Sequence, residues 1–256
     1  MRTAAAADSF GVLDRMTAIF EAFDQDDRGL RISELAVRAA LPKSTVSRLV
    51  STLVRQGYLE RDGQVIHLGL RLFELGQLAE EPRELRAIAL PAIADLRNNT
   101  GETTYLAIRD AGEMVCIAIM RGHPATTLTA RIGGRLPVHA TGLGKAMLAY
   151  ADAAEIDAVV AAGLAAWTPQ TIVERDLLLR QLSDIRRDRL AVEREEFTPD
   201  VSSVASAVFS PEGRPVAAVG VSGRADSLDI DRCAASVREA ALALTRRLAA
   251  RGTPPN

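Results

Sequence analysis

The chain has 256 residues, of which 48% are hydrophobic and 25% are charged, and its formal net charge is −2. This composition excludes a largely disordered chain, and the length allows two modest domains, each with a core of its own. No uncharged apolar run could span a membrane, and Cys116 and Cys233 stand far apart outside any CxxC motif. With no secretion signal either, we expect a cytoplasmic protein that acts away from membranes and needs neither a metal nor a cofactor.

The charge is unevenly distributed along the chain. Residues 1–27 hold two basic and six acidic side chains, whereas residues 28–71 hold eight basic and three acidic ones. Positive charge concentrated in one segment is typical of a nucleic-acid-binding surface. Ahead of this segment, apolar residues at helical spacing predict an amphipathic helix over residues 12–23, which can close a small core against later helices.

Two further helices are expected in the basic segment. The first should have Ser33 as its N-cap, and the second should begin at Pro42 and end just before Gly57. Apolar residues at helical spacing give the second helix one buried stripe, formed by Val46, Leu49, Val50, Leu53 and Val54. Its opposite face is polar and basic, and residues 35–59 contain no Asp or Glu. A basic helix face is often only solvated, so its setting must decide its role.

The setting is a predicted β-hairpin. Residues 58–61 and 64–67 predict two short strands joined by Asp62-Gly63, a pair common in two-residue hairpins. Helix, turn, helix and hairpin together predict a winged helix-turn-helix, whose second helix enters the major groove of double-stranded DNA with its N-terminal half. The expected DNA contacts lie at the start of that helix and on the wing: Lys43, Ser44, Thr45, Ser47, Arg48 and Arg61.

A family resemblance is carried by ISELAVRAALPKSTVSRLVSTLVRQGYLE and the following HLGLRLFELG. These segments are similar to the DNA-binding region of the IclR-type bacterial transcriptional regulators. The resemblance implies a regulator, more often a repressor, in which a GAF-like effector domain follows the DNA-binding domain. The expected division is a winged helix-turn-helix over residues 1–67, a linker helix over residues 68–80 and an effector domain over residues 81–256.

The predicted linker helix is apolar on two sides. Leu72 and Leu75 lie on one of them, and such a helix packs either on another subunit or on its own domains. Because the resembling family pairs through this region, we expect a homodimer or a dimer of dimers that buries Leu72 and Leu75 between subunits.

The second half predicts an α+β domain. Helices are expected over residues 84–99, 142–149, 153–162, 173–189 and 230–251, and strands over residues 103–109, 114–120, 127–132, 203–209 and 215–221. Tight turns at residues 110–113 and 210–214 require antiparallel pairing of the strands that they join.

A candidate anion site lies in the sequence HATGLGKAMLA. A phosphate-binding loop is excluded, because His139 and Ala146 stand where that motif needs glycine and a hydroxyl residue. Thr141 is expected to cap a helix, which would leave the N–H groups of Gly142 and Leu143 free for a carboxylate. Taken alone, the stretch is better explained as an ordinary turn into a helix that threonine caps.

The same stretch is similar to the effector-domain signature of IclR-type regulators. The resemblance implies that this helix start binds the carboxylate of a small organic acid, and that Glu193, Ser203, Gly220 and Ser222 complete the pocket. The missing side chain of Gly220 suggests room for a bulkier, aromatic acid. Glu193 would accept from a ligand hydroxyl or amide, which favours hydroxy acids.

Catalysis is the rival interpretation, as a small-molecule-processing enzyme with an accessory nucleic-acid-binding domain. His67, His123 and His139 belong to no recognisable catalytic motif, and Cys116 lies within an apolar strand where a buried, inert thiol is usual. A purely architectural DNA-binding protein would have a filled second domain. The sequence therefore predicts a ligand-responsive transcriptional regulator with no catalytic residues.

Overall fold

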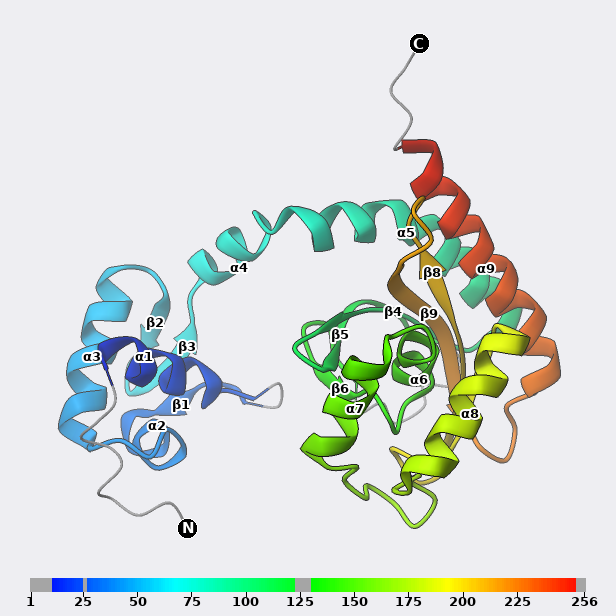
Figure 1. The fold of residues 1–256 in the computed structure, drawn as a ribbon. Coiled ribbons are helices and arrows are strands. Elements are labelled where there is room, and N and C mark those ends of the chain that lie inside the picture. The colour runs from blue at the N-terminus through cyan, green and yellow to red at the C-terminus, as the bar shows by residue number, and fades with distance from the viewer. Residues whose placement is uncertain (1–10, 25–26, 123–129, 252–256) are drawn as a thin grey trace. The chain divides into compact units, whose positions relative to one another are not determined.

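A computed structural model of the chain describes residues 11–24, 27–122 and 130–251 (Figure 1). Two compact units are present, residues 1–80 and residues 81–256. Within the described residues, no helix is long and apolar enough to cross a membrane.

Unit 1 is a winged helix-turn-helix. Its elements are α1 (Val12–Glu21), β1 (Leu30–Arg31), α2 (Ile32–Arg38), α3 (Lys43–Arg55), β2 (Leu59–Asp62), β3 (Val65–Leu68) and α4 (Leu70–Gly76). The three strands form an antiparallel sheet in the order β1-β3-β2. Val46, Val50 and Leu53 of the predicted α3 stripe are buried, while Leu49 and Val54 pack against the core from partly buried positions. The predicted stripe is therefore confirmed.

The ends of α3 also follow the sequence. Pro42 is its N-cap residue, one position outside the helix, and Gly57 follows the last turn with a φ of +78°. An L side chain is strained at such a φ, whereas glycine is not. The entry to α2 differs from the prediction: the helix begins at Ile32, and the Glu34 carboxylate accepts from the N–H of Arg31 at 2.6 Å. Ser33 therefore lies inside the helix, and its prediction as the N-cap was wrong.

The wing hairpin is displaced by one residue from the prediction. Asp62 pairs with Val65, so the loop is Gly63-Gln64 and not Asp62-Gly63. The third strand explains this register, because Ile66 pairs with Leu30 of β1 and both are buried. A shift by one residue would turn Ile66 to the opposite face of the sheet.

Helix α4 is anchored to its own unit on one side and apolar on the other. The Arg71 guanidinium donates to the carbonyl of Gln56 at 3.0 Å and lies 5.0 Å from the ring centroid of Tyr58. Leu72 is half-buried. Large apolar side chains in and beside α4 are nonetheless exposed: Leu68, Leu70, Phe73, Leu75 and Leu78.

Unit 2 is an α+β structure with one antiparallel sheet. Its helices are α5 (Glu80–Thr100), which begins with the last residue of unit 1, α6 (Gly142–Leu148), α7 (Ala153–Ala162), α8 (Arg175–Asp188) and α9 (Ile230–Arg251). Its strands are β4 (Thr103–Asp110), β5 (Glu113–Met120), β6 (Arg135–Pro137), β7 (Ala191–Arg194), β8 (Val201–Phe209) and β9 (Pro215–Arg224). Their order in the sheet is β6-β5-β4-β9-β8-β7, and every neighbouring pair is antiparallel.

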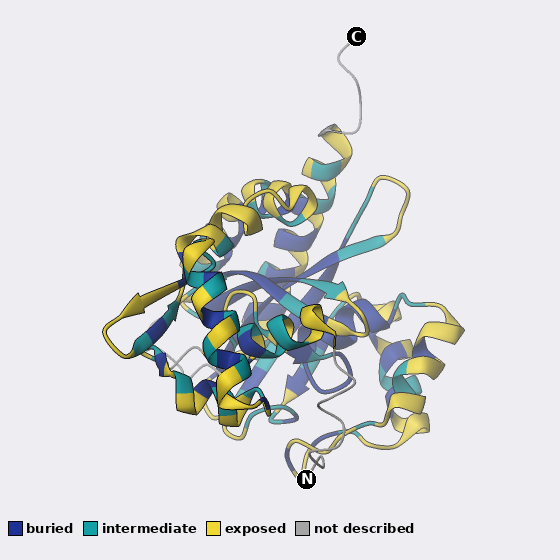
Figure 2. Cartoon of the chain, turned by 90° about the vertical axis from the view of Figure 1, so that its left-hand side faces the viewer, coloured by how far each residue is buried: buried dark blue, intermediate teal, exposed yellow. Residues whose placement is uncertain are grey.

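The sheet of unit 2 separates two hydrophobic cores (Figure 1). Successive residues of a strand point to opposite faces. Leu106 accordingly packs with α5 and α9, while Tyr105 and Ala107 pack with α6 and α8. In Figure 2 the sheet is buried over most of its length, and the loop that joins β8 to β9 is exposed.

Three predictions for unit 2 need correction. The strand expected over residues 127–132 falls partly outside the described residues, and its described part is not a strand; the neighbour of β5 is β6. Strand β7 was not predicted. The helix expected from residue 84 begins at Glu80, because Pro82 lies in its first turn, where the missing N–H removes no hydrogen bond.

Candidate functional site

The predicted DNA-contacting residues lie on the outer face of α3 and on the wing. Lys43, Ser44 and Arg48 are exposed, Thr45 and Ser47 are partly buried, and Arg61 is exposed on β2. Lys43, Arg48 and Arg61 form no ion pair with any residue that the structure describes. Their charges are therefore available to phosphates or base edges.

Arg38 is a basic residue of this segment with a different role. Its guanidinium bonds both oxygens of Asp27, at 2.5 and 3.0 Å, and donates to the carbonyl of Ala22. The hydrogen bond from Arg38 also lowers the pKa of Asp27. Arg38 thus joins α2 to the segment that follows α1.

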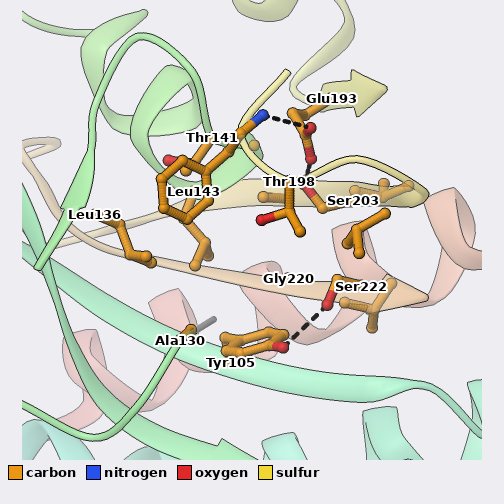
Figure 3. Close-up of a pocket in the computed structure, with 16 residues that line it drawn as sticks. Tyr105, Ala130, Leu136, Thr141, Leu143, Glu193, Thr198, Ser203, Gly220 and Ser222 are labelled. Atoms are coloured by element: carbon orange, nitrogen blue, oxygen red, sulfur yellow. Dashed lines mark hydrogen bonds between the residues drawn. The ribbon is translucent and has the colours of Figure 1, made fainter. Parts of the chain in front are cut away.

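A cavity lies in unit 2 between the start of α6 and the inner face of the sheet (Figure 3). We call it the α6 cavity. It is lined by all seven predicted effector-site residues, Thr141, Gly142, Leu143, Glu193, Ser203, Gly220 and Ser222, together with Tyr105, Ala130, Leu136, Phe197, Thr198, Val201, Val204, Ala205 and Val221. Its volume is about 70 Å³, several times the roughly 10–15 Å³ that one water requires. The cavity is thus suited to a small ligand.

The α6 end of the cavity is rich in hydrogen-bond donors. Thr141 is the N-cap, and its hydroxyl accepts from the N–H of Gly144 at 3.1 Å while donating to the carbonyl of Pro137. The first intrahelical hydrogen bond of α6 runs from the N–H of Lys145 to the carbonyl of Thr141. The N–H groups of Gly142 and Leu143 come before it and therefore have no partner within the helix. The predicted capped helix start is confirmed.

Glu193 organises a second side of the cavity. One of its carboxylate oxygens accepts from the N–H of Glu196 at 2.6 Å and of Phe197 at 3.3 Å, and the other accepts from the Ser203 hydroxyl at 2.8 Å. Glu193 is almost fully buried, and this burial raises its pKa despite the three donors. The carboxylate therefore fixes Ser203 and the loop that carries Phe197.

Tyr105 and Ser222 form a third polar group. The Ser222 hydroxyl donates to the Tyr105 phenol oxygen at 3.0 Å, and both residues are buried. Tyr105 lies on β4 opposite Gly220 of β9. A Cβ added at Gly220 would lie 2.6 Å from the carbonyl oxygen of Val204 and 2.8 Å from the Cβ of Ala205. The missing side chain thus provides no extra room for a ligand, contrary to the sequence-based inference.

Lys145 is part of the structure behind this site. Its side chain is fully buried, and its ammonium lies 2.5 Å from a Glu196 carboxylate oxygen. The other Glu196 oxygen is buried without a hydrogen-bond partner among the described residues. Burial lowers the pKa of Lys145, while Glu196 acts in the opposite direction. In the sequence, Lys145 stood out only as the lysine of the excluded phosphate-binding loop.

His139, Cys116 and Cys233, which the sequence offered as catalytic candidates, have the surroundings of structural residues. His139 is buried, with its Nε2 3.0 Å from the carbonyl oxygen of Ala165. Burial raises the pKa of Cys116 to about 12 and that of Cys233 to about 11, so both thiols stay protonated at neutral pH. His123 lies outside the described residues. Within those residues, no group of three or more His, Cys, Asp or Glu could hold a metal ion.

Sequence reasoning missed Tyr105 and Phe197, which line the α6 cavity with the seven predicted residues. The sequence did contain a signal for Tyr105. This residue shares a face of its strand with Thr103 and Ala107, and that face is less apolar than the opposite one. Nothing local to residues 195–198 indicated Phe197, since a fold-back of the chain after β7 brings it to the cavity.

Comparison with known proteins identifies the class. Residues 12–63 match the IclR helix-turn-helix domain, and residues 78–248 match the C-terminal domain of bacterial transcriptional regulators of the IclR type. The chain is 33% identical to the transcriptional repressor AllR of Klebsiella pneumoniae over 86% of this chain and 82% of the relative. It is 32% identical to the transcriptional regulator XynR of Escherichia coli over 92% and 96%.

Solved structures agree with these matches. An IclR homologue from Microbacterium hydrocarbonoxydans, complexed with 4-hydroxybenzoate, aligns with a TM-score of 0.87 at 29% identity over 95% of this chain and 100% of that one. IclR of Thermotoga maritima aligns with a TM-score of 0.77 at 26% identity over 93% and 98%.

The protein is therefore a transcriptional regulator, not an enzyme, with a DNA-binding helix-turn-helix domain and an effector domain. It belongs to the IclR family.

Proposed function

We propose that a small organic acid binds the α6 cavity and changes the affinity of the helix-turn-helix domain for its operator. The observation that carries the proposal is that the start of α6 and the strands β7, β8 and β9 meet at this cavity. Together they supply Gly142, Leu143, Glu193, Ser203 and Ser222. The N–H groups at the start of α6 favour a carboxylate, since they present unpaired donors to it.

An aromatic or hydroxy acid fits the rest of the cavity. Phe197, Leu136 and Leu143 give it apolar walls, and the Glu193 carboxylate keeps acceptor capacity beyond its three present donors. A ligand hydroxyl or amide close to the carboxylate end can therefore donate to Glu193. The 4-hydroxybenzoate complex of the Microbacterium homologue supports this class of ligand.

The regulator is proposed to act as a repressor. The AllR proteins, which are 31–33% identical to this chain, are named transcriptional repressors. In a repressor, the acid would release the operator by favouring a form of the protein that binds DNA less tightly.

The binding of the acid and its effect on DNA are tested in two steps. Calorimetric titration with small aliphatic and aromatic acids should identify binders. Any binder should then change the affinity for an operator, selected from a random DNA library, about 5- to 150-fold. If acids bind but none changes operator affinity, the protein is not a sensor of these acids.

DNA recognition is proposed to involve Lys43, Ser44, Thr45, Ser47 and Arg48 on α3, with Arg61 of the wing on a phosphate. Arg48 is the candidate for base contact because it is exposed on α3 and free of ion pairs with described residues. Arg48→Ala should therefore weaken operator binding by about 1–3 kcal/mol and affect random DNA less.

Arg61→Ala is the matched control for Arg48→Ala. A phosphate contact carries no sequence information, so its loss should weaken operator and random DNA alike. Quantitative DNA-binding measurements at one fixed salt concentration would compare the variants. Equal losses on both DNAs for Arg48→Ala would rule out base contact by Arg48.

The active form is proposed to be a homodimer or a dimer of dimers. The exposed apolar side chains of α4 and its flanks, Leu68, Leu70, Phe73, Leu75 and Leu78, support this assembly, because a patch of this kind favours a protein partner. A symmetric dimer would present two copies of α3 to two operator half-sites.

A further inference from the structure

We propose that Tyr105 sets the ligand specificity of the α6 cavity, by donating its phenolic hydrogen to a second oxygen of the bound acid. The inference rests on the proposed function and specifies the ligand further. It names the chemical group that the acid must carry at the end away from its carboxylate.

Strand register brings Tyr105 and Ser222 together. Tyr105 of β4 pairs with Gly220 of β9, and Ser222 follows two residues later on the same face of β9. A β-carbon at Gly220 would meet Val204 and Ala205 of β8, so only glycine fits at this position of β9. The Ser222 hydroxyl then reaches the phenol oxygen at 3.0 Å and donates to it.

This direction of donation leaves the Tyr105 hydrogen unused. A phenol can donate one hydrogen bond as well as accept. Ser222 occupies the acceptor side, and the Tyr105 hydroxyl donates to none of the described residues. In an unfolded chain, water would accept this hydrogen bond. Tyr105 is only 5% exposed but lines the cavity, so a bound ligand can supply the acceptor instead.

The hydroxyl remains a donor under all ordinary conditions. Burial raises the pKa of Tyr105 to about 12, above its ordinary value of 10.0. At neutral pH the phenol is therefore protonated. An anionic group at this end of the ligand would be a second buried charge beside an uncharged tyrosine, which is costly. A hydroxyl or carbonyl oxygen would accept the hydrogen bond from Tyr105 without that cost.

The position of Tyr105 determines where the second oxygen must be. Figure 3 shows the Tyr105–Ser222 pair across the cavity from Thr141 and Glu193. A carboxylate at the start of α6 would therefore direct the far end of the ligand toward Tyr105. The chemical class is a small acid with a hydroxyl or oxo oxygen at the end opposite its carboxylate.

Matched pairs of acids test this role. The pairs are 4-hydroxybenzoate with benzoate and 4-hydroxybutanoate with butanoate, each measured by calorimetry against the wild-type full chain and its Tyr105→Phe variant. In at least one pair, the wild type should bind the hydroxy acid about 3- to 10-fold more tightly than its partner, as expected for one hydrogen bond. In Tyr105→Phe this ratio should fall to about one, while the affinity for the unsubstituted acid stays the same.

A fluorescence titration gives a parallel measurement of the same affinities. Trp167 is the single tryptophan of the chain, and its ring centroid lies 5.0 Å from that of Phe197, which lines the cavity. Ligand contact with Phe197 should change the emission of Trp167. This measurement requires no added label.

Two further variants separate specificity from general effects on the fold. Ser222 positions the phenol without needing to touch the ligand, so Ser222→Ala should lower the selectivity ratio less than Tyr105→Phe does. Tyr150→Phe is the matched control, because Tyr150 packs on Phe209 at a ring-centroid distance of 4.9 Å and does not line the cavity. Its selectivity ratio should equal that of the wild type.

The outcomes distinguish this inference from the proposed function. Two results would refute the role of Tyr105 while leaving the proposed function unaffected. In the first, an acid binds but Tyr105→Phe keeps the wild-type selectivity ratio. In the second, the wild type binds both members of each pair equally. If none of the four acids binds, this class of ligand is wrong for the cavity and the inference falls with it.

Discussion

A Lys145→Met variant is expected to lose about 3–5 kcal/mol of unfolding free energy, measured on the full chain by chemical denaturation. Methionine keeps most of the length of lysine but removes the charge. Glu196 would then keep a buried carboxylate with no cation, and one of its oxygens already has no hydrogen-bond partner among the described residues. An unpaired buried charge is far more costly than a buried pair.

A double-mutant cycle tests this explanation. Glu196→Gln in the Lys145→Met background removes the unpaired charge, so the double variant should be more stable than Lys145→Met alone. Additive losses would show that Lys145 and Glu196 are not coupled.

Arg175→Met provides the surface control. Arg175 pairs with Asp157 at 2.8 Å, but both side chains are at least half exposed. Surface ion pairs contribute little, so the midpoint of unfolding should not change measurably.

The double variant Phe73→Glu with Leu75→Glu is expected to dissociate the proposed dimer. The two side chains are 63% and 45% exposed, so the charges should not disturb the core of their own subunit. Loss of the second subunit removes avidity for two half-sites, which should weaken operator binding by about 100-fold or more. Light scattering would give the mass in solution, and titration of operator DNA would give the affinity.

Val37→Glu is the control for this pair. Val37 is 81% exposed on α2, outside the proposed interface, and should leave the mass unchanged. A wild-type chain that is monomeric at micromolar concentration would refute the dimer. An unchanged mass for Phe73→Glu with Leu75→Glu would instead place the interface elsewhere.

Local signals in the sequence were sufficient for many elements. Pro42 and Gly57 bounded α3 because each is suited to one backbone position, and Thr141 capped α6 because its hydroxyl reaches the N–H of Gly144. The hairpin turn predicted at residues 110–113 is present, since Asp110 pairs with Glu113 and leaves Ala111-Gly112 as the loop. These features depend on a few neighbouring residues, so they can be read without knowing the rest of the fold.

Other local signals were overridden. Ser33 is a good N-cap residue, yet Glu34 bonds the N–H of Arg31 and the helix begins earlier. Asp62-Gly63 is a good hairpin pair, yet the pairing of Ile66 with Leu30 set the register of the wing. In both places a competing contact was stronger than the intrinsic preference of one residue.

By itself, the sequence determined the winged helix-turn-helix, the α+β class of the second domain and seven of the residues that line the α6 cavity, because periodicity, caps and family motifs are recorded along the chain. Only the tertiary structure decided that Tyr105 and Ser222 share a hydrogen bond, and that Lys145 is buried against Glu196. These partners lie 117 and 51 residues apart. Their contacts arise from strand register and from the fold-back of the chain after β7, and no local pattern encodes either.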